Sequence, residues 1–243
     1  MMTQMGAPRS NPSEGPAAAL AGAALTLARR FAAGATMWCV APQWPSHARH
    51  VAVEFVHPVI VGKRALPACS LEGEEAERAL RLLARPGDIL LLVAPADDAG
   101  AANLLSRAEA WGLTRLWLGT GQRPASSRAD HLVWTDTREP ELAPYSGDLV
   151  LLYHLLWELT HVVFEHPGLL TPDSACTEEV CITCSDEGRV AEVRALLGRG
   201  MVEVIAEGKH EAVDASLVDP VAPGDLLLIH AGVALTALAG DRS

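Results

Sequence analysis

The strongest constraint on the fold is an alternation of short apolar runs with helical patterns over the first two-thirds of the chain. Strands that are apolar along their whole length are typical of a parallel sheet with helices on both faces. We expect strands at Thr36–Ala41, 59–66, Asp88–Ala94, Leu113–Gly119 and Ala129–Thr135, and helices at 17–33, 46–56, 72–84, 98–111 and 146–165. The pattern therefore predicts an α/β domain, a three-layer sandwich around a parallel sheet.

After Pro172 the pattern changes. Gly188, Gly200, Gly208 and Gly224 separate short runs, and apolar and acidic residues alternate in 202–207. Closely spaced short strands with glycine turns predict a small, OB-like β-barrel. We expect a flexible tail at 1–16, the α/β domain at 17–170, a linker at 171–180 and the barrel domain at 181–243.

Composition and charge limit the classes of partner. The 243 residues are 49% hydrophobic and 20% charged, enough apolar material for one or two cores. A net charge of −11 opposes binding to nucleic acid or to an anionic membrane surface. No apolar run reaches the roughly twenty residues of a membrane span, and Arg29 and Arg30 follow the apolar stretch Ala17–Ala28 instead of preceding it. We therefore expect a cytoplasmic protein whose first helix is not a signal peptide.

Three of the five cysteines lie close together at the start of the barrel domain: Cys176, Cys181 and Cys184. This spacing indicates thiol or metal chemistry in a reducing compartment. Cys181 and Cys184 can supply two thiolates for iron, or the three can form an incomplete zinc site. The alternative is that one cysteine is functional and the others are bystanders in a linker.

The most specific string in the chain is Pro223–Leu235, which reads PGDLLLIHAGVAL. A Gly-Asp turn followed by an apolar strand that ends in His-x-Gly resembles the closing motif of the HypC/HupF family of [NiFe]-hydrogenase maturation chaperones. Three further segments resemble the same family: Cys181-Ile182, Gly188-Arg189-Val190 and Ser216-Leu217-Val218.

The resemblance implies a role in handling iron. In this family a cysteine and the histidine at the strand end are associated with iron that carries cyanide and carbon monoxide ligands, which corresponds to Cys181 and His230 here. Cys184 is a further candidate ligand. The implied partners are a HypD-like scaffold and the hydrogenase large-subunit precursor. Cys181 departs from the family pattern because it is internal and lacks the Pro-Gly step that follows the family's cysteine.

The α/β part resembles the SIS (sugar isomerase) domain, particularly its phosphoheptose isomerase branch. In that fold, loops rich in glycine and serine bind a sugar phosphate at helix N-termini. Here the first loop reads APQWPSH over Ala41–His47, with Ser46 as the remaining phosphate contact. The second loop, Ala94–Asp98, carries two carboxylates that would repel phosphate. The changed loops oppose ordinary phosphosugar isomerisation.

Histidines and carboxylates recur at helical spacing in this part. His50 and Glu54 are four residues apart and resemble the His-x-x-x-Glu pair that some phosphoheptose isomerases use to bind metal. On the last helix, His154, Glu158 and His161 continue one face. We interpret these five residues as candidate ligands of a divalent metal such as zinc. The alternative is a solvent-exposed or dimer-facing stripe.

We therefore expect a hydrogenase maturation chaperone that assembles or delivers the Fe(CN)2CO unit. A degenerate SIS domain would serve homodimerisation or ligand sensing. The alternative is a metal-dependent enzyme of the phosphosugar isomerase type, or a protein that binds a carbohydrate derivative.

Overall fold

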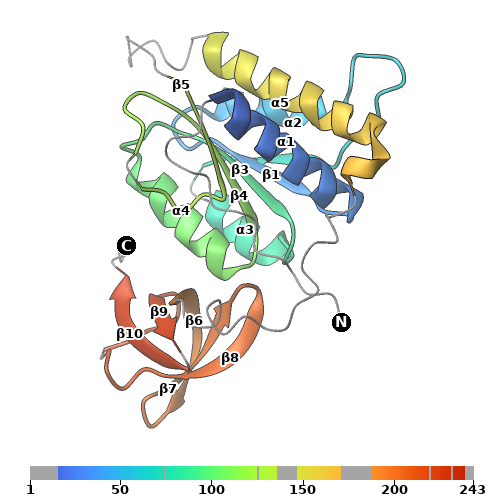
Figure 1. Cartoon of the computed structure of the whole chain (residues 1–243). Coiled ribbons are helices and arrows are strands. Elements are labelled where there is room, and N and C mark those ends of the chain that lie inside the picture. Colours follow the sequence, from blue (N-terminus) through green and yellow to red (C-terminus); the bar gives the residue numbers. More distant parts are fainter. Residues whose placement is uncertain are drawn as a thin grey trace.

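A computed structural model describes residues 16–73, 75–124, 126–135, 147–170, 188–218, 220–230 and 232–238. These residues form an α/β domain and a separate small barrel next to it (Figure 1). Several predicted features lie outside the described residues: positions 1–15 of the tail, the linker at 171–180, and Cys176, Cys181 and Cys184.

The α/β domain is built on a five-stranded sheet in the order β2-β1-β3-β4-β5, and every neighbouring pair is parallel. Its strands are β1 (Met37–Val40), β2 (Ala68–Leu71), β3 (Ile89–Val93), β4 (Thr114–Thr120) and β5 (His131–Thr135). Its helices are α1 (Pro16–Ala32), α2 (Pro45–Val56), α3 (Ala76–Leu83), α4 (Ala99–Ala110) and α5 (Gly147–Glu165), and the short 3-10 helix η2 (Pro167–Leu169) follows α5.

Side chains of each central strand alternate between two cores. On β3, Ile89 and Leu91 face the core shared with α1, α2 and α5, whereas Leu90 and Leu92 face the core shared with α3 and α4. All four are fully buried. This period of two explains why the strand is apolar along its whole length. The predicted three-layer sandwich is confirmed.

The strand predicted at 59–66 is wrong. Val59 and Val61 are 84% and 101% exposed and lie in a turn between α2 and β2, where Gly62 has a positive φ of 89°. The strand forms later, at Ala68–Leu71, where it pairs with β1. Pro58 and Gly62 flank the apolar triplet, and this turn chemistry outweighs its hydrophobicity.

The C-terminal domain is a closed barrel in the order β10-β8-β7-β6-β9, as the glycine-separated runs predict. Its strands are β6 (Arg189–Gly198), β7 (Met201–Ala206), β8 (Lys209–Asp214), β9 (Leu226–His230) and β10 (Val233–Leu238). A small apolar core fills it, with Val193, Val204 and Leu227 completely buried. On β7, buried apolar residues at Val202, Val204 and Ala206 alternate with partly exposed ones, as in other small barrels.

The barrel packs on α3 and α4 through a buried carboxylate. Glu192 on β6 is completely inaccessible to solvent. Its Oε2 accepts a 2.7 Å hydrogen bond from Trp111 Nε1, and its Oε1 lies 2.7 Å from Arg81 Nη2. Arg107 Nη1 lies 3.6 Å from the same carboxylate and donates to the Gly224 carbonyl at 2.9 Å. Since a buried charge is tolerated only with charged and hydrogen-bonding partners, Glu192 fixes the barrel to the α/β domain.

The turn between β7 and β8 makes a second contact across this junction. The Gly208 backbone N–H donates to the Ala110 carbonyl at 2.9 Å. A Cβ at Gly208, whose φ is +74°, would lie 2.5 Å from Pro86 Cγ. Only glycine permits both this conformation and this close approach. Val190 and Leu226 extend the core of the α3 and α4 layer into the barrel.

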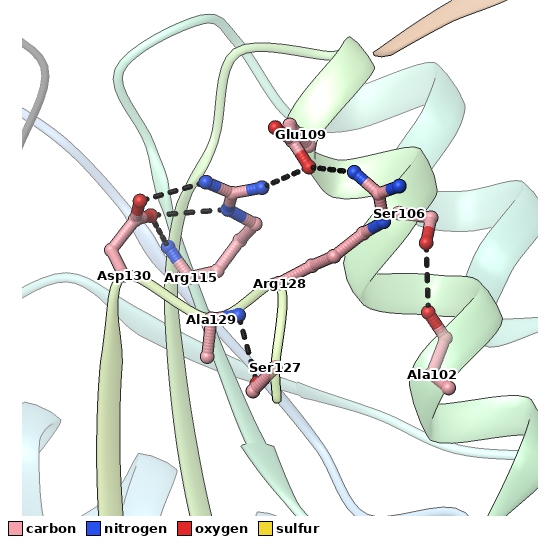
Figure 2. Close-up of polar contacts among 8 residues, drawn as sticks. All are labelled: Ala102, Ser106, Glu109, Arg115, Ser127, Arg128, Ala129 and Asp130. Atoms are coloured by element: carbon pink, nitrogen blue, oxygen red, sulfur yellow. Dashed lines mark hydrogen bonds and ion pairs between the residues drawn. The ribbon is translucent and has the colours of Figure 1, made fainter. Parts of the chain in front are cut away.

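A buried polar network holds the end of α4 that carries the junction residues. Arg115 on β4 donates from Nη2 to Asp130 Oδ1 and forms an ion pair from Nη1 to Glu109 on α4, each at 2.7 Å (Figure 2). Arg128 also contacts Glu109, at 3.1 Å. Burial alone would lower the pKa of Arg115, but Asp130 and Glu109 outweigh it and raise that pKa. The network joins α4 to β4 and to the residues directly before β5.

Among the described residues, no helix has both the length and the apolar content that crossing a membrane requires.

Candidate functional site

The sheet order reverses between β1 and β3, and in open α/β sheets ligands bind at this point, beyond the carboxyl ends of the strands. Here the loops after β1 and β3 are tied to each other. Gln43 Nε2 donates to Asp98 Oδ2 at 3.1 Å, while Asp98 Oδ1 accepts from the Ala101 backbone N–H at 2.9 Å. Asp98 is buried and caps the N-terminus of α4.

A helix N-terminus at the strand ends is a common binding position for phosphate. In this chain the Asp98 carboxylate occupies that position at the N-terminus of α4. A second anion beside it would be repelled and would have to compete for the same backbone N–H groups. Ser46, the predicted phosphate contact, is exposed in the first turn of α2. The geometry agrees with the sequence in opposing phosphate binding at this edge.

A second arrangement of polar side chains lies on α2 and α5. His50, Glu54 and His154 form a group in which one ligand atom from each residue lies within 4.8 Å of the others. Glu54 Oε1 is 3.3 Å from His50 Nε2 and 3.3 Å from His154 Nε2. The side chains are partly exposed, 41%, 23% and 42% respectively, so a cation can reach them from solvent.

These separations fit a divalent metal. Two ligands at bonds of about 2.1 Å in a tetrahedral site are about 3.4 Å apart, close to the two distances that Glu54 makes. Two imidazoles and one carboxylate are a donor set that binds zinc and leaves a fourth position open. His50, Glu54 and His154 are therefore the residues that would hold such an ion.

Tyr153 contacts both histidines of this cluster. It is completely buried, and its hydroxyl is 2.7 Å from His50 Nδ1. Its ring makes edge contacts with His47, His50 and His154 at centroid distances of 5.1 to 6.0 Å. Burial, and secondarily the Glu54 carboxylate, raises the pKa of Tyr153 to about 12, so the hydroxyl stays protonated at neutral pH.

The structure does not bring the other two predicted ligands to this cluster. His161 is buried, with Nδ1 2.9 Å from the Trp157 carbonyl and Nε2 3.0 Å from the Arg64 carbonyl, so both ring nitrogens are occupied. His161 also lies seven positions after His154, a rise of about 10 Å along the helix, which is too far for one ion. Glu158 is exposed on α5 and is not in the group.

In the barrel, His230 ends β9 and is partly buried. The register pairs Arg189 with Ile229, which places the first described residue of the barrel, Gly188, beside the histidine end of β9. A Cβ on Gly188 would lie 3.1 Å from Leu228 Cδ1. The described part of the barrel therefore begins beside the strand end that holds His230.

The sequence reasoning missed Tyr153 and Glu192. Tyr153 directly precedes His154, but only the packing of α5 on α2 brings its hydroxyl to His50. Glu192 has charged residues near it in the sequence, which favours an exposed position. Its partners Arg81 and Trp111 are about 80 to 110 positions away. A carboxylate inside a strand that is otherwise apolar, VAEV at 190–193, is the one signal that the sequence offers.

Known proteins resemble each of the two domains, the barrel and the α/β domain. Residues 187–242 match the model of the HupF/HypC family. This confirms for the C-terminal part the resemblance inferred from the Pro223–Leu235 string. No curated protein matches the chain.

Solved structures match the α/β part. A phosphoheptose isomerase from Francisella tularensis aligns with a TM-score of 0.51 and 16% identity over 59% of this chain and 85% of that chain. A protein from Escherichia coli aligns with a TM-score of 0.45 and 15% identity over 60% of this chain and 79% of that chain. The first match confirms the predicted SIS-type fold.

Proposed function

We propose that this chain is a maturation factor for [NiFe]-hydrogenase whose barrel carries or receives iron with cyanide and carbon monoxide ligands. The match to the HupF/HypC family over 187–242 supports the class. The observation that carries the proposal is the register of β6 with β9, because it sets Gly188 beside the strand end that holds His230. Cys181 lies seven positions before Gly188, and an extended chain of that length spans at most about 24 Å, which is ample to reach His230.

In this proposal Cys181 binds the iron as a thiolate and His230 binds it as a neutral imidazole, with Cys184 as a further thiolate. Thiolate is a soft ligand and imidazole suits iron, so the pair is chemically reasonable. The iron unit is cargo, because a cysteine on a lead-in segment can be passed between partners by exchange of one ligand. The partners would be a HypD-like scaffold or the large-subunit precursor.

The partner test is affinity capture. Tagged full-length chain, produced together with hydrogenase maturation proteins, should retain a maturation scaffold or a large-subunit precursor. Cys181→Ala and His230→Ala should weaken this capture at least tenfold. The matched controls are Cys69→Ala, which removes an exposed thiol of the α/β domain, and His210→Ala, which removes an exposed imidazole of β8. Equal capture by Cys181→Ala and Cys69→Ala would contradict the proposal.

A second function is favoured by the cluster on α2 and α5. In it, the α/β domain binds a divalent metal at His50, Glu54 and His154 and acts on, or senses, a polar carbohydrate derivative. The donor set and the two 3.3 Å separations support metal binding. Asp98 opposes a phosphorylated substrate at the strand ends. Elemental analysis should find about one zinc per chain at this site, lost in His50→Ala, and the absence of that difference would refute it.

Self-association is the third part of the proposal. Val53 on α2 and Leu151 and Leu155 on α5 are 48%, 57% and 41% exposed beside the histidine cluster. Exposed apolar side chains on neighbouring helices favour pairing of two copies through this face. Light scattering of the full chain should give a dimer mass, and Leu151→Glu should convert it to a monomer.

A further inference from the structure

We infer that Tyr153 is the positioning residue of the α2 and α5 cluster: its hydroxyl holds the His50 ring so that Nε2 is directed at Glu54 and His154. This inference rests on the metal site of the proposed function. It follows from a continuous chain of contacts in which Tyr153 Oη is 2.7 Å from His50 Nδ1 and His50 Nε2 is 3.3 Å from Glu54 Oε1.

Tyr153 has little freedom to take another position. Its side chain is completely buried, and among the described residues His50 is the hydrogen-bond partner found for its hydroxyl. The two rings meet edge-on at 5.1 Å, and the Tyr153 ring also contacts His154 edge-on at 5.3 Å. One buried side chain therefore supports both histidines, while the histidines themselves are 41% and 42% exposed. Without that support, two half-exposed imidazoles would sample several rotamers.

The hydroxyl suits both states of the site because it can donate or accept without moving its oxygen atom. Without a cation, His50 Nε2–H can donate to Glu54, and Nδ1 then accepts a hydrogen bond from the tyrosine O–H. When Nε2 binds a cation, its lone pair must be free, so the ring proton resides on Nδ1 and donates to Tyr153 Oη. The proton count of the neutral ring is the same in both states, and solvent exchanges the proton between the two nitrogens.

A hydrogen-bond partner on the second nitrogen of a histidine ligand commonly changes metal affinity 10- to 100-fold. We therefore expect Tyr153→Phe to weaken zinc binding by about 10- to 100-fold, since phenylalanine keeps the ring packing and removes only the hydroxyl. The matched control is Thr160→Val on the same helix. It also removes a completely buried hydroxyl, but that hydroxyl donates to the Leu156 carbonyl at 2.6 Å and does not contact the cluster.

The experiment is a calorimetric titration of the full chain with Zn²⁺. The parent protein carries Cys176→Ser, Cys181→Ser and Cys184→Ser, which remove the thiols at the start of the barrel domain. Tyr153→Phe should lose affinity while Thr160→Val and the parent agree within twofold. Nitrogen-15 spectra of the histidine rings supply a readout that a purely structural role would not change. In the parent, the His50 proton should move from Nε2 to Nδ1 on zinc binding, and Tyr153→Phe should show a mixture of the two tautomers without zinc.

The outcomes separate this inference from the function on which it rests. If the parent binds zinc and Tyr153→Phe binds it equally well with an unchanged ring spectrum, the positioning role is overturned and the metal site stands. If the parent binds no zinc, or if His50→Ala binds as the parent does, both the metal function and the positioning role are overturned.

Discussion

The α/β domain and the barrel preserve different parts of the proteins that they match. The α/β domain has the layered fold of a phosphoheptose isomerase, but Gln43 and Asp98 join the two loops where that fold would bind a ligand. The barrel matches the HupF/HypC family model over 187–242, and His230 ends β9 beside Gly188. A fold can stay the same while the residues in its loops change. The fold and the function of each part must therefore be tested separately.

The largest expected effect is at the junction between these two parts. Glu192→Ala leaves Arg81 and Arg107 without their buried carboxylate, and breaking a buried ion pair commonly costs about 3–5 kcal/mol. Denaturant unfolding should show this loss, and proteolysis should separate the barrel from the α/β domain. Glu211→Ala is the matched control, because its pair with Arg189 is about one-third exposed and worth under about 1 kcal/mol. Equal losses for both variants would show that the junction does not depend on Glu192.

A smaller effect on the same junction is expected from Gly208→Ala. The new Cβ would lie 2.5 Å from Pro86 Cγ and would also impose a left-handed backbone on alanine, a total of about 2–3 kcal/mol. Gly198→Ala separates the two contributions, since Gly198 has a φ of +85° with nothing within 4 Å of its Cβ position, and it should lose only about 1 kcal/mol. If both variants unfolded at the same denaturant concentration, the turn would not be in tight contact with the α/β domain.

The sequence allowed much of the fold to be predicted, because continuous apolar runs such as Ile89–Val93 have few places other than the centre of a covered sheet. It failed at 59–66, where equally apolar residues lie in an exposed turn between Pro58 and Gly62. The distinction lies in the turn residues Pro58 and Gly62 that flank the triplet, which local hydrophobicity does not report.

The candidate site was predicted only in part, because the sequence reports spacing within a helix and does not report packing between helices. Helical spacing puts His50 and Glu54 on one face, and His154 meets them because α5 packs on α2. Spacing and the resemblance to the isomerases also selected His161, but Arg64 supplies a backbone carbonyl that binds its ring. Contacts such as those of Tyr153 and Glu192 depend on packing between distant segments, and a single sequence does not reveal them.

A modest effect is expected at the strand ends of the α/β domain. Asp98→Ala removes a helix N-cap and should cost about 1 kcal/mol. Asp97→Ala, which changes the exposed neighbouring carboxylate, should leave the free energy of unfolding within about 0.5 kcal/mol. Thermal shifts with a sugar phosphate should be absent in the wild type and in Asp97→Ala. A clear shift in the wild type would mean that Asp98 does not close this edge to phosphate.

The smallest effect concerns reactivity rather than stability. Burial, and secondarily Cys69, raises the pKa of the Cys39 thiol well above its usual range, so Cys39 stays protonated and unreactive even at about pH 9. Cys69 is exposed on β2 and should be alkylated quickly at that pH. Mass spectrometry of iodoacetamide-treated native protein should find the label on Cys69 and none on Cys39. Labelling of both at similar rates would show that β1 is not in the core.

The division of roles between the two parts is tested most directly by infrared spectroscopy with iron analysis on full-length protein produced together with hydrogenase maturation proteins. The wild type should contain iron with cyanide and carbon monoxide bands, Cys181→Ala should lose them, and His50→Ala should retain them. Bands that persist in Cys181→Ala, or that disappear equally in His50→Ala, would contradict the assignment of iron handling to the barrel.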